Sequence, residues 1–136
     1  MDFLKSMAIA ASGLRAQAGR MRIISENIAN ADSTPSAAGG EPYRRKIPTF
    51  LSEFDRALDA NTVTLGPVQP DMSDFRQKYE PGHPAADANG NVKYPNINSM
   101  LEMSDMREAQ RSYEANINVI TATRRMLQRT IDILKA

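Results

Sequence analysis

The sequence predicts an α+β protein in which a long helix at each end flanks a small β-rich middle segment. All eight prolines and five of the seven glycines lie between Pro35 and Pro95. Apolar residues recur at helical spacing before and after that stretch, where proline is absent. Since proline and glycine interrupt long helices, we expect a helix in residues 1–32, β-strands and turns in 33–97, and a second helix in 98–136.

The first helix carries the apolar repeat of a coiled coil. One row recurs every seventh residue, at Met7, Leu14, Met21 and Ile28, and Leu4 belongs to the row between. More apolar side chains widen this stripe, which predicts more than one neighbour: Ile9, Ala10, Ile23 and Ile24. Gly13 and Gly19 indicate either close approach of another helix or two tolerated surface glycines.

The last helix repeats this pattern. One row consists of Met106, Tyr113, Ile120, Leu127 and Leu134, and a second consists of Met103, Ile117 and Ile131. Asn98 or Ser99 is expected to cap its start, with Glu102 completing a capping box after Ser99. Two paired helices enclose no interior, so their wide apolar faces would remain in water. We therefore expect other copies or other subunits to cover them.

The middle segment reads as short strands bounded by proline, glycine and asparagine. Residues 50–60 are an exception, because Phe50, Leu51, Phe54 and Leu58 have helical spacing, although a strand is not excluded. The Asn89–Gly90 step is the strongest hairpin signal in the chain.

No residue set predicts catalysis, a cofactor or a metal. There is no cysteine, and the single histidine, His83, has no recognisable partners and is expected in a surface loop. The "DANGN" stretch has its glycine at the wrong position for a calcium loop. A net charge of +1 and the short basic run "YRRK" give no wider basic field, which argues against nucleic acid. No cleavable signal and no apolar run long enough to span a membrane are expected.

Two stretches resemble a known family. "SENIANADST" followed by "PYRRK" is similar to the N-terminal motif of bacterial flagellar rod and hook axial proteins, and "EMSDMREAQRSYEANINVITATRRMLQRTIDILK" is similar to their C-terminal helix. The chain departs from many relatives by inserting "PSAAGGEP" after Thr34. With the short length and the stretch "PGHPAADANGNVKYPN", this insertion most resembles the subunits of the proximal rod.

The resemblance implies a non-catalytic structural subunit that polymerises into the shaft transmitting motor torque for motility. The two helices would pair as an antiparallel coiled coil in an inner layer, with residues 33–97 outside. Partners would be further copies, proximal and distal rod proteins, the rod's base at the membrane ring and export gate, and the flagellar type III export apparatus. No nucleic acid or direct membrane insertion is expected. The chain would be exported without signal cleavage into the periplasmic rod of the basal body.

The resemblance also assigns motif residues. The junction motif comprises Asn27, Asn30, Thr34, Tyr43 and Arg44, and the C-terminal motif comprises Gln110, Arg111, Tyr113, Glu114 and Asn116. The three asparagines Asn27, Asn30 and Asn116 are expected to end the first helix and fix the junction by hydrogen bonds. The heptad rows named above are expected to pack between helices and between subunits. The alternative is a cytoplasmic helical adaptor or export chaperone that does not polymerise.

Overall fold

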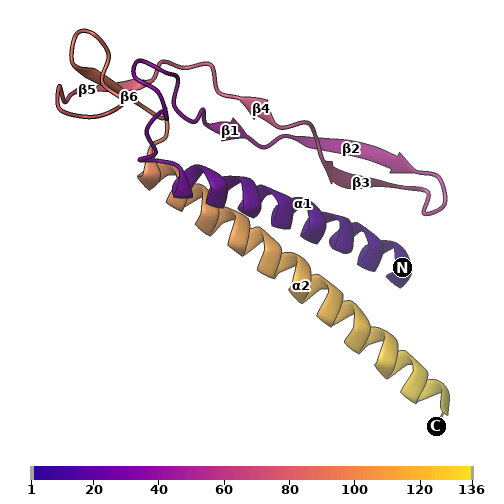
Figure 1. Cartoon of the computed structure of the whole chain (residues 1–136). Helices are drawn as coiled ribbons and strands as arrows, with labels where there is room; N and C mark the ends of the chain where they lie inside the picture. Colours follow the sequence, from indigo (N-terminus) through magenta and orange to yellow (C-terminus); the bar gives the residue numbers. More distant parts are fainter. Residues whose placement is uncertain (1, 136) are drawn as a thin grey trace. The chain divides into compact units, whose positions relative to one another are not determined.

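The structure is a computed structural model that describes residues 2–135; residues 1 and 136, the outermost positions of the predicted terminal segments, lie outside the described part. Along the chain, one long helix precedes and another follows six short strands (Figure 1). The elements are α1 (Phe3–Ala29), β1 (Lys46–Ile47), β2 (Phe50–Asp55), β3 (Ala60–Leu65), β4 (Gln69–Pro70), β5 (Arg76–Tyr79), β6 (Asn91–Tyr94) and α2 (Ser99–Lys135). The predicted α+β class is confirmed.

The chain forms two compact units, and both helices contribute to each. The helix–hairpin unit contains residues 2–21, 49–67 and 107–135 of the described chain. The junction unit contains residues 22–48 and 68–106. Each unit is therefore assembled from segments that are distant in sequence.

In the helix–hairpin unit, β2 and β3 form an antiparallel hairpin from the pair Phe50–Leu65 to the pair Asp55–Ala60. The Asp55 carboxylate accepts from the backbone N–H of Ala57 at 2.8 Å, and Asp59 takes a left-handed φ of 49°, so the chain reverses here. The helix expected at residues 50–60 is wrong. The apolar spacing is helical, but residues 50–55 pair instead with residues 60–65 as strands, and the spacing within one segment does not reveal such pairing.

The hairpin and α2 both lie against α1 in this unit. The Ser12 hydroxyl accepts from the Val63 backbone N–H at 3.2 Å. A Cβ added to Gly13 would lie 2.8 Å from Asn116 Nδ2, and Arg20 pairs with Glu108 at 3.5 Å, so the α1 and α2 segments run antiparallel. The buried side chains of this unit are small: Ala10, Ser12, Ala16, Ala109 and Thr123.

In the junction unit, β1 pairs with β4 and β5 pairs with β6, both antiparallel. The Asn89–Gly90 step lies in a turn in which the N–H of Gly90 donates to the Asp87 carbonyl at 3.0 Å, with a Gly90 φ of 81°. The step thus lies in the loop of an antiparallel β5–β6 pair, but residues 80–90 all separate the two strands, so the loop is longer than a two-residue turn. Asp87 reorganises the loop, because its carboxylate accepts from the N–H groups of Asn89 and Asn91.

Asn98 caps α2. Its side-chain oxygen accepts from the backbone N–H of Met100 at 3.1 Å and of Leu101 at 3.4 Å. The capping box expected between Ser99 and Glu102 is wrong, because the Glu102 carboxylate binds Asn27 and Arg45 instead. With Asn98 as the cap, Glu102 lies one residue too far along the helix for that motif.

Candidate functional site

The junction unit contains a buried polar network centred on Asn27, in the last turns of α1. Asn27 is completely buried, and its amide pairs with both backbone groups of Lys46: Nδ2 donates to the carbonyl at 2.8 Å, and the Lys46 N–H donates to Oδ1 at 3.0 Å. The Tyr43 hydroxyl also donates to Oδ1, and Nδ2 donates to Glu102, each at 3.2 Å. Two donors and two acceptor positions are all that an amide has, so Asn27 is fully satisfied.

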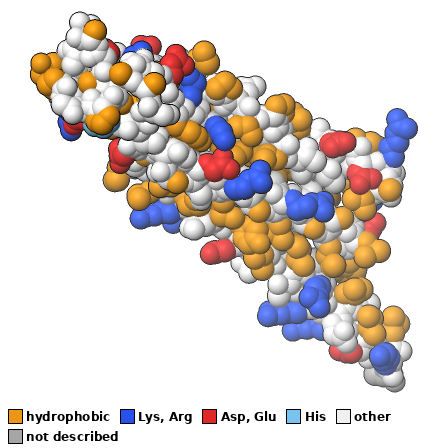
Figure 2. All heavy atoms as spheres, viewed as in Figure 1, with side chains coloured by type: hydrophobic (Ala, Val, Ile, Leu, Met, Phe, Trp, Pro, Cys, Tyr) orange, Lys and Arg blue, Asp and Glu red, His pale blue; other side chains and the backbone are white. Residues whose placement is uncertain are grey.

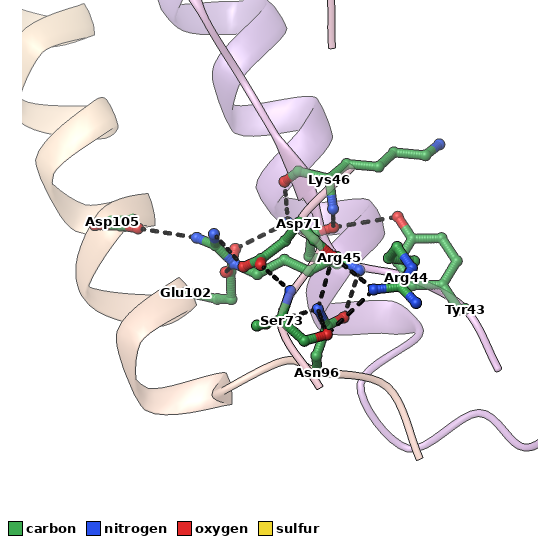
Figure 3. Close-up of polar contacts among 10 residues, drawn as sticks. Tyr43, Arg44, Arg45, Lys46, Asp71, Ser73, Asn96, Glu102 and Asp105 are labelled. Carbon is green, nitrogen blue, oxygen red and sulfur yellow. Dashed lines mark hydrogen bonds and ion pairs between the residues drawn. The ribbon is translucent and has the colours of Figure 1, made fainter. Parts of the chain in front are cut away.

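Arg45 joins this network to α2 (Figure 3). Its Nε donates to the Glu102 carboxylate, and its terminal nitrogens lie 3.5 Å from Asp71 and 3.9 Å from Asp105. Glu102 is only 1% exposed, and a buried carboxylate is costly without an ionic partner and hydrogen bonds. Burial opposes the charge on Arg45, but hydrogen bonding and attraction from Glu102 and Asp71 outweigh it, so the pKa of Arg45 is raised. The guanidinium therefore stays charged and ties the middle segment to α2.

A second layer of contacts holds residues 71–75 against the chain at Arg44 and Arg45. The Asn96 side chain accepts from the Arg45 N–H at 2.9 Å and donates to the Asp71 carbonyl at 3.0 Å. Arg44 donates to the same carbonyl at 2.9 Å, and its guanidinium lies 4.1 Å from the centre of the Phe75 ring. Hydrogen bonds from Ser73, followed by attraction from Arg45, lower the pKa of Asp71. The Asp71 carboxylate thus remains ionised beside Arg45.

The rim of the network is an exposed ion pair. Lys46 Nζ lies 2.9 Å from Glu26, near the end of α1. Their hydrogen bond lowers the pKa of Glu26 and raises the pKa of Lys46. Two cations of the "YRRK" run thus have acidic partners: Arg45 pairs with Glu102 and Asp71, and Lys46 pairs with Glu26.

A hollow of about 350 Å³ opens beside the network, lined by Arg45, Asp71, Asn96, Asn98, Leu101, Glu102 and Asp105. Its carboxylates face one shared guanidinium, which is an arrangement for holding segments together. Within residues 2–135, no group of three or more histidine or acidic side chains is arranged to hold a metal ion. The ion pairs and hydrogen bonds at this hollow join the chain at Arg45 to Asp71 and to the start of α2.

The structure brings only part of the junction motif into the network. Asn27 and Tyr43 belong to it directly, and Arg44 holds its second layer. Asn30 instead donates to the Glu26 carbonyl at 2.8 Å, one turn back on α1. Thr34 is exposed on the segment that follows.

The C-terminal motif lies in the other unit. Asn116 contacts Gly13 of α1 and donates to the Ser112 carbonyl of its own helix at 3.0 Å. Tyr113 is half-buried, whereas Gln110, Arg111 and Glu114 are exposed. The side-chain hydrogen bond of Asn116 is therefore made within α2.

The heptad rows are incompletely covered within this single chain. The half-buried members are Met7, Leu14, Met21, Ile28, Met106, Tyr113 and Ile120, and the exposed members are Leu4, Met103, Ile117, Leu127, Ile131 and Leu134. Small residues beside these rows fill the closest contacts in the helix–hairpin unit, and Ile23 and Ile24 are the buried pair of α1 in the junction unit.

Sequence reasoning missed the most connected members of the network. The sequence marks Arg45 only as one cation of a basic run and Glu102 only as part of a capping box, and no pattern marks Asp71 or Asn96. Their signal is weak because the four positions are spread over 58 residues and form no local pattern.

Two regions of the chain, one at each end, match known protein families. Residues 7–37 match the family described as "Flagella basal body rod protein", and residues 88–133 match "Flagellar basal body rod FlgEFG protein C-terminal". A relative from Agrobacterium fabrum, "Flagellar basal-body rod protein FlgC", is 54% identical and aligns over 100% of this chain and 99% of its own length. The chain belongs to the FlgC family of flagellar basal-body rod proteins.

Other FlgC relatives are more distant but equally complete. Those of Bacillus subtilis and Salmonella typhimurium are each 37% identical, covering 99% and 98% of this chain and 100% and 98% of their own lengths. The resemblance identified from the terminal motifs is thus confirmed over the full chain. Among residues 2–135, no helix of this FlgC-family chain is both long and apolar enough to cross a membrane.

Proposed function

We propose that this rod protein is a structural subunit of the proximal rod, where it polymerises into the shaft that transmits motor torque for motility. The observation that carries the proposal is the uncovered apolar surface of two long helices. Leu4, Met100, Ile133 and Leu134 are each more than 70% exposed. Orange side chains gather along the lower part of α2 in Figure 2. Apolar surface of this extent in a soluble protein is typical of an interaction surface.

The buried polar network supplies the second requirement of a shaft, which is resistance to deformation. Asn27, Arg45 and Glu102 connect the end of α1, the returning chain and the start of α2 by hydrogen bonds and an ion pair. Buried, fully paired polar groups fix one geometry, because any displacement leaves a charge or donor unpaired. We infer that the network keeps the middle segment in a fixed position relative to the helix ends of the junction unit.

The basal body is the location that the family supports. We infer a periplasmic rod position, reached through the flagellar type III export apparatus without signal cleavage. Partners are further copies of the chain, proximal and distal rod proteins, and the rod's base at the membrane ring and export gate. No observation favours the cytoplasmic adaptor or export chaperone over this role.

The test introduces a charge into a heptad row. Ile120→Asp is expected to abolish complete rods in detergent-extracted basal bodies and to stop swimming, because it places a carboxylate in a half-buried apolar row. Asn118→Asp is the matched control, since it adds the same side chain at an exposed position of α2. Intact rods and normal swimming with Ile120→Asp would contradict the packing role. Recovery of the unmodified chain only in the cytosol, never in basal bodies, would favour the adaptor.

A further inference from the structure

In the helix–hairpin unit, α2 extends past the end of α1. Gly13 lies beside Asn116, and Arg20 lies beside Glu108. In an antiparallel pair, each step toward the start of α1 corresponds to a step of equal length toward the end of α2. In this register Phe3, the first residue of α1, lies opposite Met126 of α2. The last residues of α2, 127–135, therefore have no α1 residue opposite them.

This end of α2 is amphipathic and basic. We call residues 124–135 the basic tail: its cations are Arg124, Arg125, Arg129 and Lys135, and its one acid is Asp132. Its apolar residues are exposed, from 36% for Leu127 to 81% for Leu134. Asp132 already accepts a hydrogen bond from Gln128 at 2.9 Å. Within the described chain, every ion pair involves residues outside the basic tail.

The hairpin β2–β3 offers the complementary surface. It carries three carboxylates, Glu53, Asp55 and Asp59, against one cation, Arg56. Phe50 and Phe54 alternate with Glu53 and Asp55 along β2, and the two rings are 41% and 56% exposed. Successive side chains of a strand point to opposite faces, so the two rings lie on one face of β2 and the two carboxylates lie on the other. A helix that lies along the edge of β2 can therefore reach both faces.

A groove continues the apolar face of the hairpin. Its volume is about 550 Å³, and its walls are Phe50 and Val63 of the hairpin, Ile9, Gly13 and Ala16 of α1, and Ala115 and Asn116 of α2. Three of the residues that line it, Gly13, Ala16 and Ala115, are small and leave room for a side chain from outside. The part of the basic tail that has no α1 residue opposite it begins at residue 127. At 1.5 Å per helical residue, this is about 16 Å along α2 from Asn116, so the basic tail of the same chain runs away from this groove.

We propose that the basic tail of one copy docks along β2 of a second copy, with its apolar side chains in the groove and its cations beside Glu53 and Asp55. Opposite charge and exposed apolar surface on both sides select this occupant. The inference rests on the proposed polymerisation and names two of the surfaces that polymerisation joins.

Cysteine cross-linking tests the contact, because the chain has no cysteine of its own. Two differently tagged copies are expressed together, one with Phe54→Cys and one with Leu134→Cys, both at exposed positions. Oxidation of isolated basal bodies is expected to give a heterodimer carrying both tags. Replacing the first variant by Met72→Cys, at an exposed apolar position of the junction unit, is expected to lower the heterodimer at least about fivefold, since a disulfide needs Cα atoms within about 7 Å.

Rods of normal yield without the heterodimer, or with equal heterodimer from Met72→Cys, would overturn the docking contact and leave the proposed function standing. Absence of the unmodified chain from basal bodies would instead overturn the function.

Charge reversal gives an independent measurement that does not depend on cysteine incorporation. Glu53→Arg and Arg124→Glu are each expected to reduce the chain recovered in basal bodies about fivefold, and the double variant to restore it, because the pair then attracts again. Arg107→Glu, at an exposed position of α2 before the basic tail, is the matched control and is expected to leave recovery unchanged. A double variant no better than either single one would overturn the proposal.

Discussion

The junction unit and the helix–hairpin unit use opposite means of stabilisation. In the junction unit, Asn27 and Glu102 are buried and fully paired, and the apolar core includes Ile23, Ile24 and Val92. In the helix–hairpin unit the buried side chains are small, and the large apolar ones, such as Phe54 and Leu134, remain exposed. Both units expose large apolar side chains, Met72 and Met100 in the junction unit among them, but only the junction unit encloses large apolar residues together with a buried ion pair.

The largest expected effect comes from breaking the buried ion pair of the junction unit. Glu102→Ala leaves Arg45 and an Asn27 donor without their partner, and loss of one member of a buried pair costs about 3 kcal/mol. The free energy of unfolding is measured by urea titration with circular dichroism. Glu108→Ala is the matched control in the other unit, because Glu108 is exposed and such an ion pair with Arg20 is worth less than about 1 kcal/mol. Equal losses would remove the proposed contrast between the units.

A somewhat smaller loss is expected from Asn27→Ala. The substitution leaves the N–H and C=O of Lys46 and the Tyr43 hydroxyl without their partner inside the junction unit, at about 2 kcal/mol. Asn30→Ala, which removes one hydrogen bond to a helix carbonyl, should cost about 1 kcal/mol in the same unfolding experiment. If the two asparagines proved equivalent, Asn27 would not be the centre of the network.

In the helix–hairpin unit, Gly13→Val tests how closely the helices pack. A Cβ at Gly13 already lies 2.8 Å from Asn116 Nδ2, so valine must displace that side chain, at about 1 kcal/mol in the unfolding free energy. Ala18→Val, at an exposed position of α1, provides the control for β-branching within a helix. Equal effects at both positions would mean that α1 and α2 tolerate a wider separation.

The smallest effect concerns pH. The pKa of Asp71 is depressed, so its ionised form stabilises the folded state above the ordinary value of 3.8, and this contribution disappears as the pH falls through the lower folded value. Asp71→Asn should therefore be less stable than the unmodified chain at pH 7, by about 0.5 kcal/mol for a partly exposed group. The difference should shrink toward pH 3 in unfolding titrations. A difference that stays constant with pH would assign the effect to packing.

Local patterns in the sequence predicted the helices well. The heptad rows and the absence of proline located α1 and α2 to within a few residues, because a helix is held by hydrogen bonds between neighbours in sequence. The same local reasoning failed at residues 50–60, and at the Asn89–Gly90 step it indicated a hairpin but not the length of its loop. There, pairing with a distant strand and the Asp87 side chain decided the conformation.

The candidate site was predicted only in part, for the same physical reason. Asn27 and Tyr43 stood out through the family motif, but the pairing of Arg45 with Glu102 joins residues 57 positions apart. No spacing rule connects them, since the contact exists only when both helix ends meet in the junction unit.

The sequence by itself determined the secondary structure of the ends, the segmented distribution of proline and glycine, and membership of the rod family. Those properties depend on local periodicity and on motifs that need no partner to be recognised. Only the tertiary structure decided which polar groups became buried and which apolar residues stayed exposed. Burial depends on what lies opposite each side chain, and the buried network of Asn27 and Glu102 takes its partners from segments distant in sequence.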